Sequence, residues 1–160
     1  KQKQQNQILF DSLSGKQLVI DGSSCHQTLA SQSQAPVMEI SEFLVKELLQ
    51  IPVKMKHPRI VLHPTCSGVE AGTNQAMETI ARHIAEDVVI PIDWKCCGFA
   101  GDRGLLIPEL TANATKFEAI EALGASGLMV SNNQPCQLGL AGATGKPCIS
   151  ILEAWLRSVR

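Results

Sequence analysis

The stretch RIVLHPTCSG, residues 59–68, joins three consecutive apolar residues to a proline, a cysteine and a glycine. Its first half has the composition of a strand that is buried on both faces, rather than the alternation of a half-exposed strand. Its second half leaves the strand and places Cys66 where a helix is expected to begin. The stretch therefore predicts a buried strand with a cysteine just beyond its carboxyl end.

Four other short runs share this character. They read KQLVID at 16–21, DVVIPI at 87–92, GLMVS at 127–131 and CISI at 148–151. Segments with helical periodicity separate them, and helices are expected over 38–50, 75–86, 108–123, 136–143 and 152–159. This alternation predicts an α/β fold of the doubly wound, Rossmann-like type. A parallel sheet of about four to five strands would lie between two helical layers.

Three of the expected helices carry an apolar face that should turn toward the sheet. The residues of these faces are Ile40, Phe43, Leu44 and Leu48; Met77, Ile80, Ala81 and Ile84; and Leu110, Phe117, Ile120 and Leu123.

The composition indicates one globular α/β domain over residues 1–160. The net charge is -1, aromatic residues make up 4% and tyrosine is absent. The chain therefore lacks the basic patch and the stacking platform typical of nucleic-acid-binding proteins. The opening KQKQQNQILFDSLSGK has the character of a helix end, which leads us to interpret the chain as a C-terminal fragment of a longer polypeptide.

Five of the six cysteines follow a predicted strand by three to five residues. The five are Cys25, Cys66, Cys96, Cys97 and Cys136. Because the carboxyl ends of parallel strands share one edge of a sheet, we expect these thiols to gather there. The sixth, Cys148, lies inside the last predicted strand and is interpreted as a small buried hydrophobic residue.

Thiols gathered in this way suit a soft metal, either an iron–sulfur cluster or zinc. Six cysteines with no recognisable secretory signal favour a reducing compartment, which keeps thiols free or bound to metal. The chain has neither the C-x2-C knuckle of most zinc sites nor the closely spaced cysteines of a ferredoxin. Reactive thiols and purely structural cysteines therefore stay open beside a metal centre.

The surroundings of the cysteines favour a metal centre. Cys66 and Cys136 each come at an expected helix start, which should lower the pKa of the thiol. Glycines at 68, 98, 101 and 104 would let the backbone approach a bulky cofactor, and Arg103 could offset its negative charge. His63 is interpreted as a hydrogen-bonded residue at a strand end, with orientation of a ligand as the alternative. Glu118 is interpreted as part of a solvated helix face.

The cysteine pattern resembles a known family. The single cysteine after HPT, the CCGFAG segment at 96–101 and the last cysteine before QLGL are similar to the cysteine-rich CCG domain. That domain occurs in one of the subunits of heterodisulfide reductase, in the glycolate oxidase iron–sulfur subunit and in the C-terminal part of FAD-linked D-lactate dehydrogenases. The stretch CCGFAGDRGLLIPELTANAT is most similar to the last group.

The resemblance implies two copies of the segment. Residues 1–53 would hold the end of a first copy and a linker helix, and residues 59–160 a complete second copy. Cys66, Cys96, Cys97 and Cys136 would be the metal ligands, with Cys25 as the last cysteine of the first copy. The family motif closes with C-x2-C, but Asn133 stands at the first of these positions. A [4Fe–4S] cluster on four thiolates is therefore expected, or one that also uses Cys25.

The resemblance implies electron transfer within a flavin-dependent 2-hydroxyacid dehydrogenase of the D-lactate or glycolate type. The isolated chain is not expected to be catalytic. Its partners would be flavin-containing and ferredoxin-like segments of the same chain or complex, with FAD bound elsewhere and a quinone or membrane acceptor downstream. The implied location is cytoplasmic, with attachment at the inner face of the membrane as an option. Two alternatives stay open: a structural or interaction module, with or without metal, and a thiol–disulfide redox protein.

Overall fold

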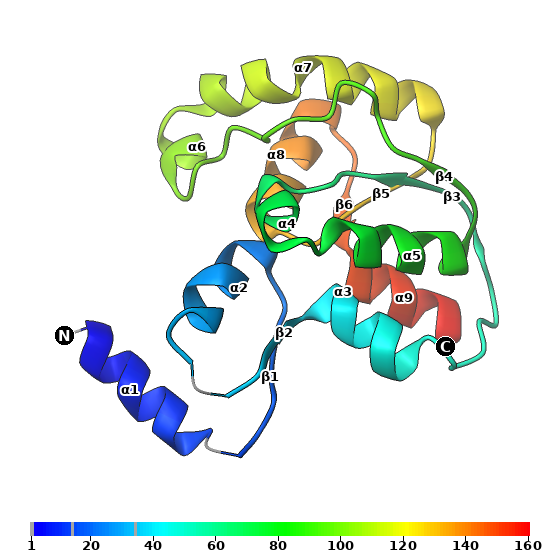
Figure 1. Cartoon of the computed structure of the whole chain (residues 1–160). Coiled ribbons are helices and arrows are strands. Elements are labelled where there is room, and N and C mark those ends of the chain that lie inside the picture. The colour runs from blue at the N-terminus through cyan, green and yellow to red at the C-terminus, as the bar shows by residue number, and fades with distance from the viewer. Residues whose placement is uncertain (1, 14, 34) are drawn as a thin grey trace.

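The computed structural model describes residues 2–13, 15–33 and 35–160, and it has the predicted α/β fold. The main sheet is parallel throughout and has the strand order β4-β3-β5-β6 (Figure 1). Its strands are β3 (His57–Leu62), β4 (Ala85–Val89), β5 (Leu128–Ser131) and β6 (Cys148–Ser150). The central position of β3 confirms the strand expected from RIVLH.

Helices cover both faces of this sheet, so the three-layer prediction is confirmed (Figure 1). One layer holds α5 (Asn74–Ile84) and α9 (Ile151–Val159), and the other holds α7 (Pro108–Ala125) and α8 (Gln134–Thr144). Two short helices, α4 (Cys66–Ala71) and α6 (Arg103–Leu106), lie in the connections that follow β3 and β4.

The core is divided by β3. Ile60 and Leu62 face α5 and α9, whereas Val61 faces α7 and α8. Consecutive apolar residues are needed because both faces of the strand are covered. The predicted apolar face of α5 is confirmed, since Met77, Ile80, Ala81 and Ile84 are all fully buried.

The first predicted strand does not join the main sheet. Strand β1 (Leu18–Ile20) pairs in parallel with β2 (Val37–Glu39) to form a separate two-stranded sheet. The helix expected over 38–50 therefore begins later, as α3 (Ile40–Phe43), and continues as a π-helical turn at Leu44–Leu48. Glu39 sets this start through a capping box: its carboxylate accepts from Ser41 N, and Glu42 accepts from Glu39 N.

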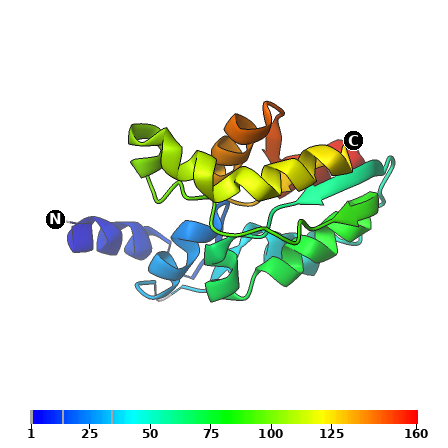
Figure 2. The ribbon, with the colours of Figure 1, turned by 90° about the horizontal axis from the view of Figure 1, so that it is seen from above.

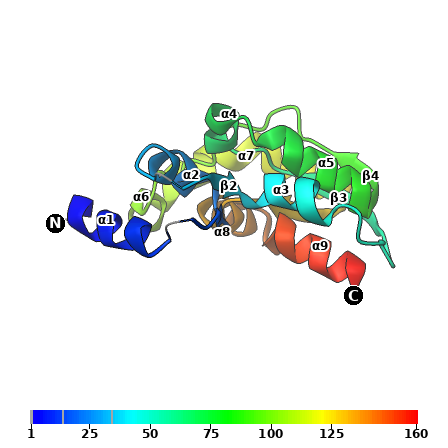
Figure 3. The same ribbon diagram turned by 60° about the horizontal axis from the view of Figure 1, so that its bottom comes forward.

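The N-terminal part also contains α1 (Gln2–Ser12) and α2 (Ser23–Ala30). Helix α1 and the C-terminal helix α9 lie at opposite ends of the molecule (Figures 2 and 3). Helix α2 instead packs against α4, next to the carboxyl edge of the main sheet. The predicted boundary between the two copies of the segment, with the first ending at residue 53 and the second beginning at residue 59, stays a prediction. The two-stranded sheet lies before this boundary, and the main sheet begins at His57.

A buried polar network joins the two sheets. Asn132, the residue after β5, donates from Nδ2 to Glu39 Oε1 at 3.2 Å. Its Oδ1 atom accepts from Thr65 Oγ1 at 3.3 Å. Thr65 Oγ1 also lies 3.0 Å from Ser23 Oγ at the start of α2. All four residues are buried, so each polar group relies on the others for hydrogen bonds.

The orientation predicted for helix α7 is wrong. Leu110, Phe117, Ile120 and Leu123, which were expected to face inward, are between 40% and 62% exposed. The buried face consists of Thr111, Thr115, Glu118, Ala119 and Ala122. This face lies close to α8, because a Cβ atom added at Gly139 of α8 would lie 2.8 Å from Thr111 Cγ2.

In the part of the chain that the structure describes, no helix combines the length and the apolar character needed to cross a membrane.

Truncating a large apolar side chain should destabilise the protein much more on α5 than on α7. Ile80→Ala should lower the free energy of unfolding by about 2–5 kcal/mol, because it leaves a cavity in a fully buried site. Phe117→Ala should cost less than about 1 kcal/mol, because the ring is 61% exposed. Urea unfolding of both variants measures the difference. Equal losses would contradict the orientation of α7.

Burial raises the pKa of Glu39 above its ordinary value, against the lowering effect of its hydrogen bonds. The folded protein then holds the proton more tightly than the unfolded chain does. The stability that this carboxyl contributes is fully present at low pH and is lost as the pH rises through the folded pKa. Glu39→Gln should therefore flatten the pH dependence of the unfolding free energy above about pH 4.5. The exposed Glu47→Gln is the matched control, and an unchanged slope in Glu39→Gln would contradict the prediction.

Candidate metal centre

Four cysteines meet at the carboxyl edge of the main sheet. Cys66 opens α4 after β3, Cys96 and Cys97 lie in the connection after β4, and Cys136 lies in the first turn of α8 after β5. The Cys66 and Cys96 sulfurs are 4.0 Å apart, and the Cys97 and Cys136 sulfurs are 3.1 Å apart. All of these thiols are free. The gathering expected from the strand ends is therefore confirmed for these four residues.

The two pairs differ in exposure. Cys66 and Cys96 face solvent, whereas Cys97 and Cys136 are 4% and 1% exposed and form a small buried cluster with Phe99. A site built on all four would have one side in the protein and one side open.

Thr65 and Asn74 hold the turn that carries Cys66. The Thr65 hydroxyl caps α4 by accepting from Gly68 N at 3.0 Å. The Asn74 side chain accepts from Thr65 N and donates to Thr65 O. A Cβ atom at Gly68 would clash with Asn74 Oδ1, so the glycine makes room for the Asn74 side chain.

The connection that carries Cys96 and Cys97 is longer than predicted, because β4 ends at Val89 rather than at residue 92. The carboxylate of Glu121 on α7 accepts from Ile92 N at 2.8 Å and from Asp93 N at 3.0 Å. Further on, Gly104 N donates to Phe99 O at 2.8 Å and closes the loop over the buried ring. The segment before the doublet is thus fixed to α7, and the segment after it is closed by a hydrogen bond from α6.

Of the two glycines that follow the doublet in the loop, one packs against α7 and the other lies in open space. Gly98 has φ +71°, and a Cβ atom there would lie 2.7 Å from Leu110 O and from Ala114 Cβ. Gly101 has φ +75° with open space around it. Arg103 begins α6 and is exposed. Packing against α7 is sufficient to explain Gly98, and a role of Gly98, Gly101 or Arg103 in cofactor binding stays a prediction.

Cys25 makes no sulfur–sulfur contact with either pair. It is exposed on α2, and among the described residues its sulfur makes no hydrogen bond. The neighbouring serines contact the site instead. Ser23 Oγ lies 2.7 Å from Ser67 Oγ, and Ser24 Oγ donates to Asn133 Oδ1 at 3.1 Å. These serines could not be found from the sequence, because no local pattern places residues 23 and 24 beside residues 67 and 133.

Asn133 occupies the position where the resembled family has a cysteine. It is buried, and its Nδ2 lies 3.6 Å from Cys136 Sγ, within reach of an N–H···S hydrogen bond. Hydrogen bonds to sulfur are one means by which a protein sets the potential of a metal–thiolate centre. Asn133 therefore supports Cys136 through its side-chain amide.

His63 and Glu118 form a buried pair next to the doublet. His63 Nδ1 lies 2.6 Å from Glu118 Oε1, and both side chains are at most 3% exposed. The interpretation of Glu118 as a solvated residue is wrong, because α7 turns this face inward. The bonded His63 agrees with the sequence interpretation, and its ring also meets Trp94 edge-on at 6.4 Å. Spacing could not have found this pair, because 55 residues separate its members.

The pKa values of the thiols depart from the helix-start expectation. A hydrogen bond with Cys136, helped by nearby His63, lowers the pKa of Cys97 to about 6. That same hydrogen bond and burial raise the pKa of Cys136. Desolvation and neighbouring Cys96 raise the pKa of Cys66. The expected lowering at Cys66 and Cys136 is therefore wrong for the metal-free protein, because burial and adjacent thiols outweigh the helix ends.

Cys148 lies outside the site, as the sequence predicted. It begins β6 and packs against the cluster that contains Val61 and Met129. Burial raises its pKa to about 12, so it is an unreactive thiol at neutral pH.

The donor set fits a soft metal by its chemistry, since it consists of four thiols that can ionise. Over residues 2–13, 15–33 and 35–160, however, no three His, Cys, Asp or Glu side chains already stand in the arrangement that would hold one metal ion. Four thiolates at about 2.3 Å from a zinc ion lie roughly 3.8 Å from each other, and a cluster needs more room. The Cys97–Cys136 pair must therefore open when a metal binds.

No model of a known protein family matches the chain, and no curated protein matches it.

Two glycines of the loop allow a test of how tightly it packs. Gly98→Ala should lower the free energy of unfolding by about 2–4 kcal/mol, since it combines a positive φ with a backbone clash. Gly101→Ala has a similar φ with open space and should cost about 1 kcal/mol. Urea unfolding compares the two, and equal costs would show that Gly98 does not pack against α7.

Proposed function

We propose that the chain is an iron–sulfur electron-transfer domain, in which Cys66, Cys96, Cys97 and Cys136 bind a [4Fe–4S] cluster. The observation that carries the proposal is the meeting of four free thiols, from three different connections, in two sulfur–sulfur contacts. Structural cysteines have no reason to converge in this way. The cluster, when bound, supplies the capacity to take up and release one electron.

The surrounding residues suit this role. Cys97 and Cys136 would anchor the buried side, while Cys66 and Cys96 would close the open side. Asn133 would donate a hydrogen bond to sulfur, and the His63–Glu118 pair would influence the charge balance beside Cys97. Each of these contacts acts on the potential of the centre.

By its resemblance to the CCG domain, the domain would serve a flavin-dependent 2-hydroxyacid dehydrogenase of the D-lactate or glycolate type. Electrons would arrive from FAD in another segment of the chain or complex and leave for a quinone or membrane acceptor. The chain's own part is to hold the centre and to set its potential.

A thiol–disulfide function is the second candidate, and one observation favours it. The sulfurs of Cys97 and Cys136 are 3.1 Å apart, and the pKa of Cys97 is lowered to about 6, as in a redox-active pair. Access argues against it, because both thiols are at most 4% exposed, and an external disulfide must reach the attacking sulfur. The cluster is therefore the preferred function of these thiols.

Anaerobic reconstitution tests the proposal. The chain should take up iron and sulfide in the ratio of a [4Fe–4S] cluster, with visible absorption and an EPR signal on reduction. Cys97→Ser should lose most of the bound iron. Cys148→Ser, the same change at a cysteine outside the site, should retain it. Because the Cys25 sulfur contacts neither pair, Cys25→Ser should retain it as well.

Three outcomes would contradict the cluster. Stoichiometric zinc without iron uptake would favour a structural metal site. A reversible two-electron dithiol titration without metal uptake would favour the thiol–disulfide function. Equal iron in Cys97→Ser and Cys148→Ser would show that any iron bound is unrelated to these four thiols.

A further inference from the structure

The outer face of helix α7 carries two neighbouring rows of exposed residues. Leu110 and Phe117 are seven residues apart, which is about two helical turns, and they form one row. Glu109 and Lys116 are also seven residues apart and form the other row. Asn113 lies between the rows and midway along them. All five side chains are exposed, so this face of α7 is open to solvent.

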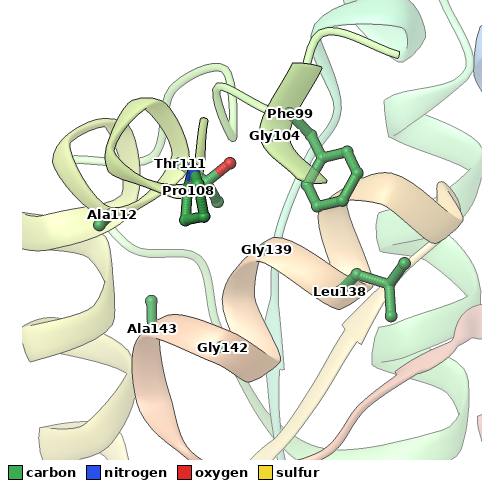
Figure 4. A pocket seen from close by; sticks show the side chains of 9 residues that line it. All are labelled: Phe99, Gly104, Pro108, Thr111, Ala112, Leu138, Gly139, Gly142 and Ala143. Atoms are coloured by element: carbon green, nitrogen blue, oxygen red, sulfur yellow. The ribbon is translucent and has the colours of Figure 1, made fainter. Parts of the chain in front are cut away.

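Exposed apolar side chains continue this face onto the neighbouring helices. Helix α6 packs against α7 and exposes Leu105 and Leu106. On α8, Leu138 is exposed and lines a cavity of about 240 Å³ between α7 and α8 (Figure 4). The other residues that line this cavity, among them Phe99 and Ala112, are uncharged. The apolar face therefore extends from α6 across α7 to α8.

The exposed apolar area of this face matches what a stable protein–protein interface needs. Eight large side chains from α6 through α7, and on α8, are between 40% and 75% exposed: Leu105, Leu106, Ile107, Leu110, Phe117, Ile120, Leu123 and Leu138. At roughly 200 Å² for a large side chain, they leave on the order of 800 Å² in contact with water. Each partner of a specific interface buries about 800 Å². The largest apolar patch of a monomeric protein is usually about 300–600 Å².

The two charges on this face have opposite signs and no ionic partner. Neither Glu109 nor Lys116 forms an ion pair with a described residue of the chain. The Lys116 ammonium lies 5.6 Å from the centre of the Phe117 ring, so it stays close to the apolar row. A second α7 that runs in the opposite direction would place its Lys116 near Glu109 and its Glu109 near Lys116. The face is therefore complementary in charge to a second copy of itself.

We propose that the chain forms a symmetric dimer in which the outer faces of two α7 helices pack antiparallel. A two-fold axis is the commonest symmetry of protein oligomers, and it requires a surface that complements itself. The area and the charges of this face both meet that requirement. The proposal goes beyond electron transfer, because none of the interface residues is one of the four thiols.

The position of the two-fold axis follows from the two rows. Two antiparallel helices bring together residues that lie about equally far before and after the axis. With the axis beside Asn113, Leu110 of one copy meets Phe117 of the second copy. On the other row, Glu109 meets Lys116 of the second copy, and symmetry makes each contact twice. The two Asn113 side chains meet at the axis, where each amide can donate to and accept from the other.

The same arrangement accounts for the exposed leucines of α6. Because the two α7 helices overlap mainly through their first halves, the second half of each helix extends toward α6 of the second copy. Ile120 would then cover Leu105 and Leu106, which α6 leaves exposed. Burial of these side chains supplies the main driving force for association.

Sedimentation equilibrium over roughly 1–100 µM tests the dimer directly. As the concentration rises, the mass should increase from the monomer value of 17.2 kDa to twice that value, with a Kd in the micromolar range or below. A reductant is present throughout, because the exposed Cys25, Cys66 and Cys96 could otherwise join two copies by a disulfide. A monomer at every concentration would overturn the proposal.

Two matched variants assign the dimer to this face. Ile120 is 62% exposed on α7, and Ile8 is 71% exposed on α1, which is not part of the face (Figure 1). Ile120→Glu buries an unpaired charge in the interface and should raise the Kd at least about a hundredfold. Ile8→Glu should dimerise as the wild type does, and equal Kd values in the two variants would overturn the proposal. Far-UV circular dichroism verifies that both variants are folded, and both should keep the iron uptake of the wild type.

Asn113→Asp tests the position of the axis. The change keeps the shape of an exposed side chain but brings two carboxylates together at the axis, so it should raise the Kd about tenfold or more at neutral pH. Protonation of the carboxyl removes the repulsion, and the dimer should recover as the pH falls toward about 4. A Kd that does not change would overturn the axis at Asn113.

Reversal of the flanking charges tests the antiparallel pairing. Glu109→Lys alone and Lys116→Glu alone each place like charges opposite one another twice, and each should raise the Kd about three- to tenfold at low ionic strength. The double variant restores opposite charges and should return the Kd to near the wild-type value. A double variant that dimerises no better than either single variant would overturn the pairing.

A membrane surface is the other occupant that an apolar face could take. Flotation with vesicles of phosphatidylcholine and phosphatidylglycerol measures this binding. If the wild type stays monomeric in solution and floats with the vesicles, and Ile120→Glu does not float, the face belongs to a membrane and the dimer is overturned. A wild type that dimerises without vesicles and loses the dimer in Ile120→Glu supports the proposal.

Discussion

The parallel pairing of β3 with β4 and β5 is the constraint on which the site depends. Ile60 of β3 lies opposite Val88 on one side and Leu128 on the other, and all three strands run in the same direction. Each strand must therefore end at the same edge, and the connection that follows it must begin there. The four thiols meet because the chain leaves three adjacent parallel strands at the same edge of the sheet. An antiparallel neighbour would have carried its cysteine to the opposite edge.

Hydrogen bonds from residues far away in the sequence then fix these connections. Thr65 is held by Asn74 on one side and by Asn132 on the other, and Ser23 brings α2 onto the same turn. Glu121 of α7 pins the segment before the cysteine doublet. These hydrogen bonds tie the turns that carry the thiols to the core and to the N-terminal part. The thiols are therefore held in place by the surrounding residues, without a bond between the sulfurs.

The packing of α7 accounts for several features at once. Because its small and polar face turns inward, α7 lies close to α8, receives the loop at Gly98 and buries Glu118 against His63. The same orientation of α7 leaves the cavity beside Phe99 and turns Phe117 and Ile120 outward. A helix that buried its larger apolar row would have filled the cavity and exposed Glu118. The chemistry around the thiols thus depends on a packing preference that hydrophobicity alone does not predict.

The sequence by itself determined the class of the fold, the parallel main sheet and the convergence of four cysteines. These follow from local patterns: consecutive apolar residues in RIVLH and GLMVS, helical periodicity between them, and cysteines just after the strands. Only the tertiary structure decided that β1 pairs with β2 outside the main sheet, which face α7 buries, and that Glu118 meets His63. The same holds for the pairing of Cys66 with Cys96 and of Cys97 with Cys136, and for the pKa values of these thiols. The physical reason is that these features depend on contacts between residues distant in the chain, whose energies, from close helix packing, burial and neighbouring thiols, no local pattern records.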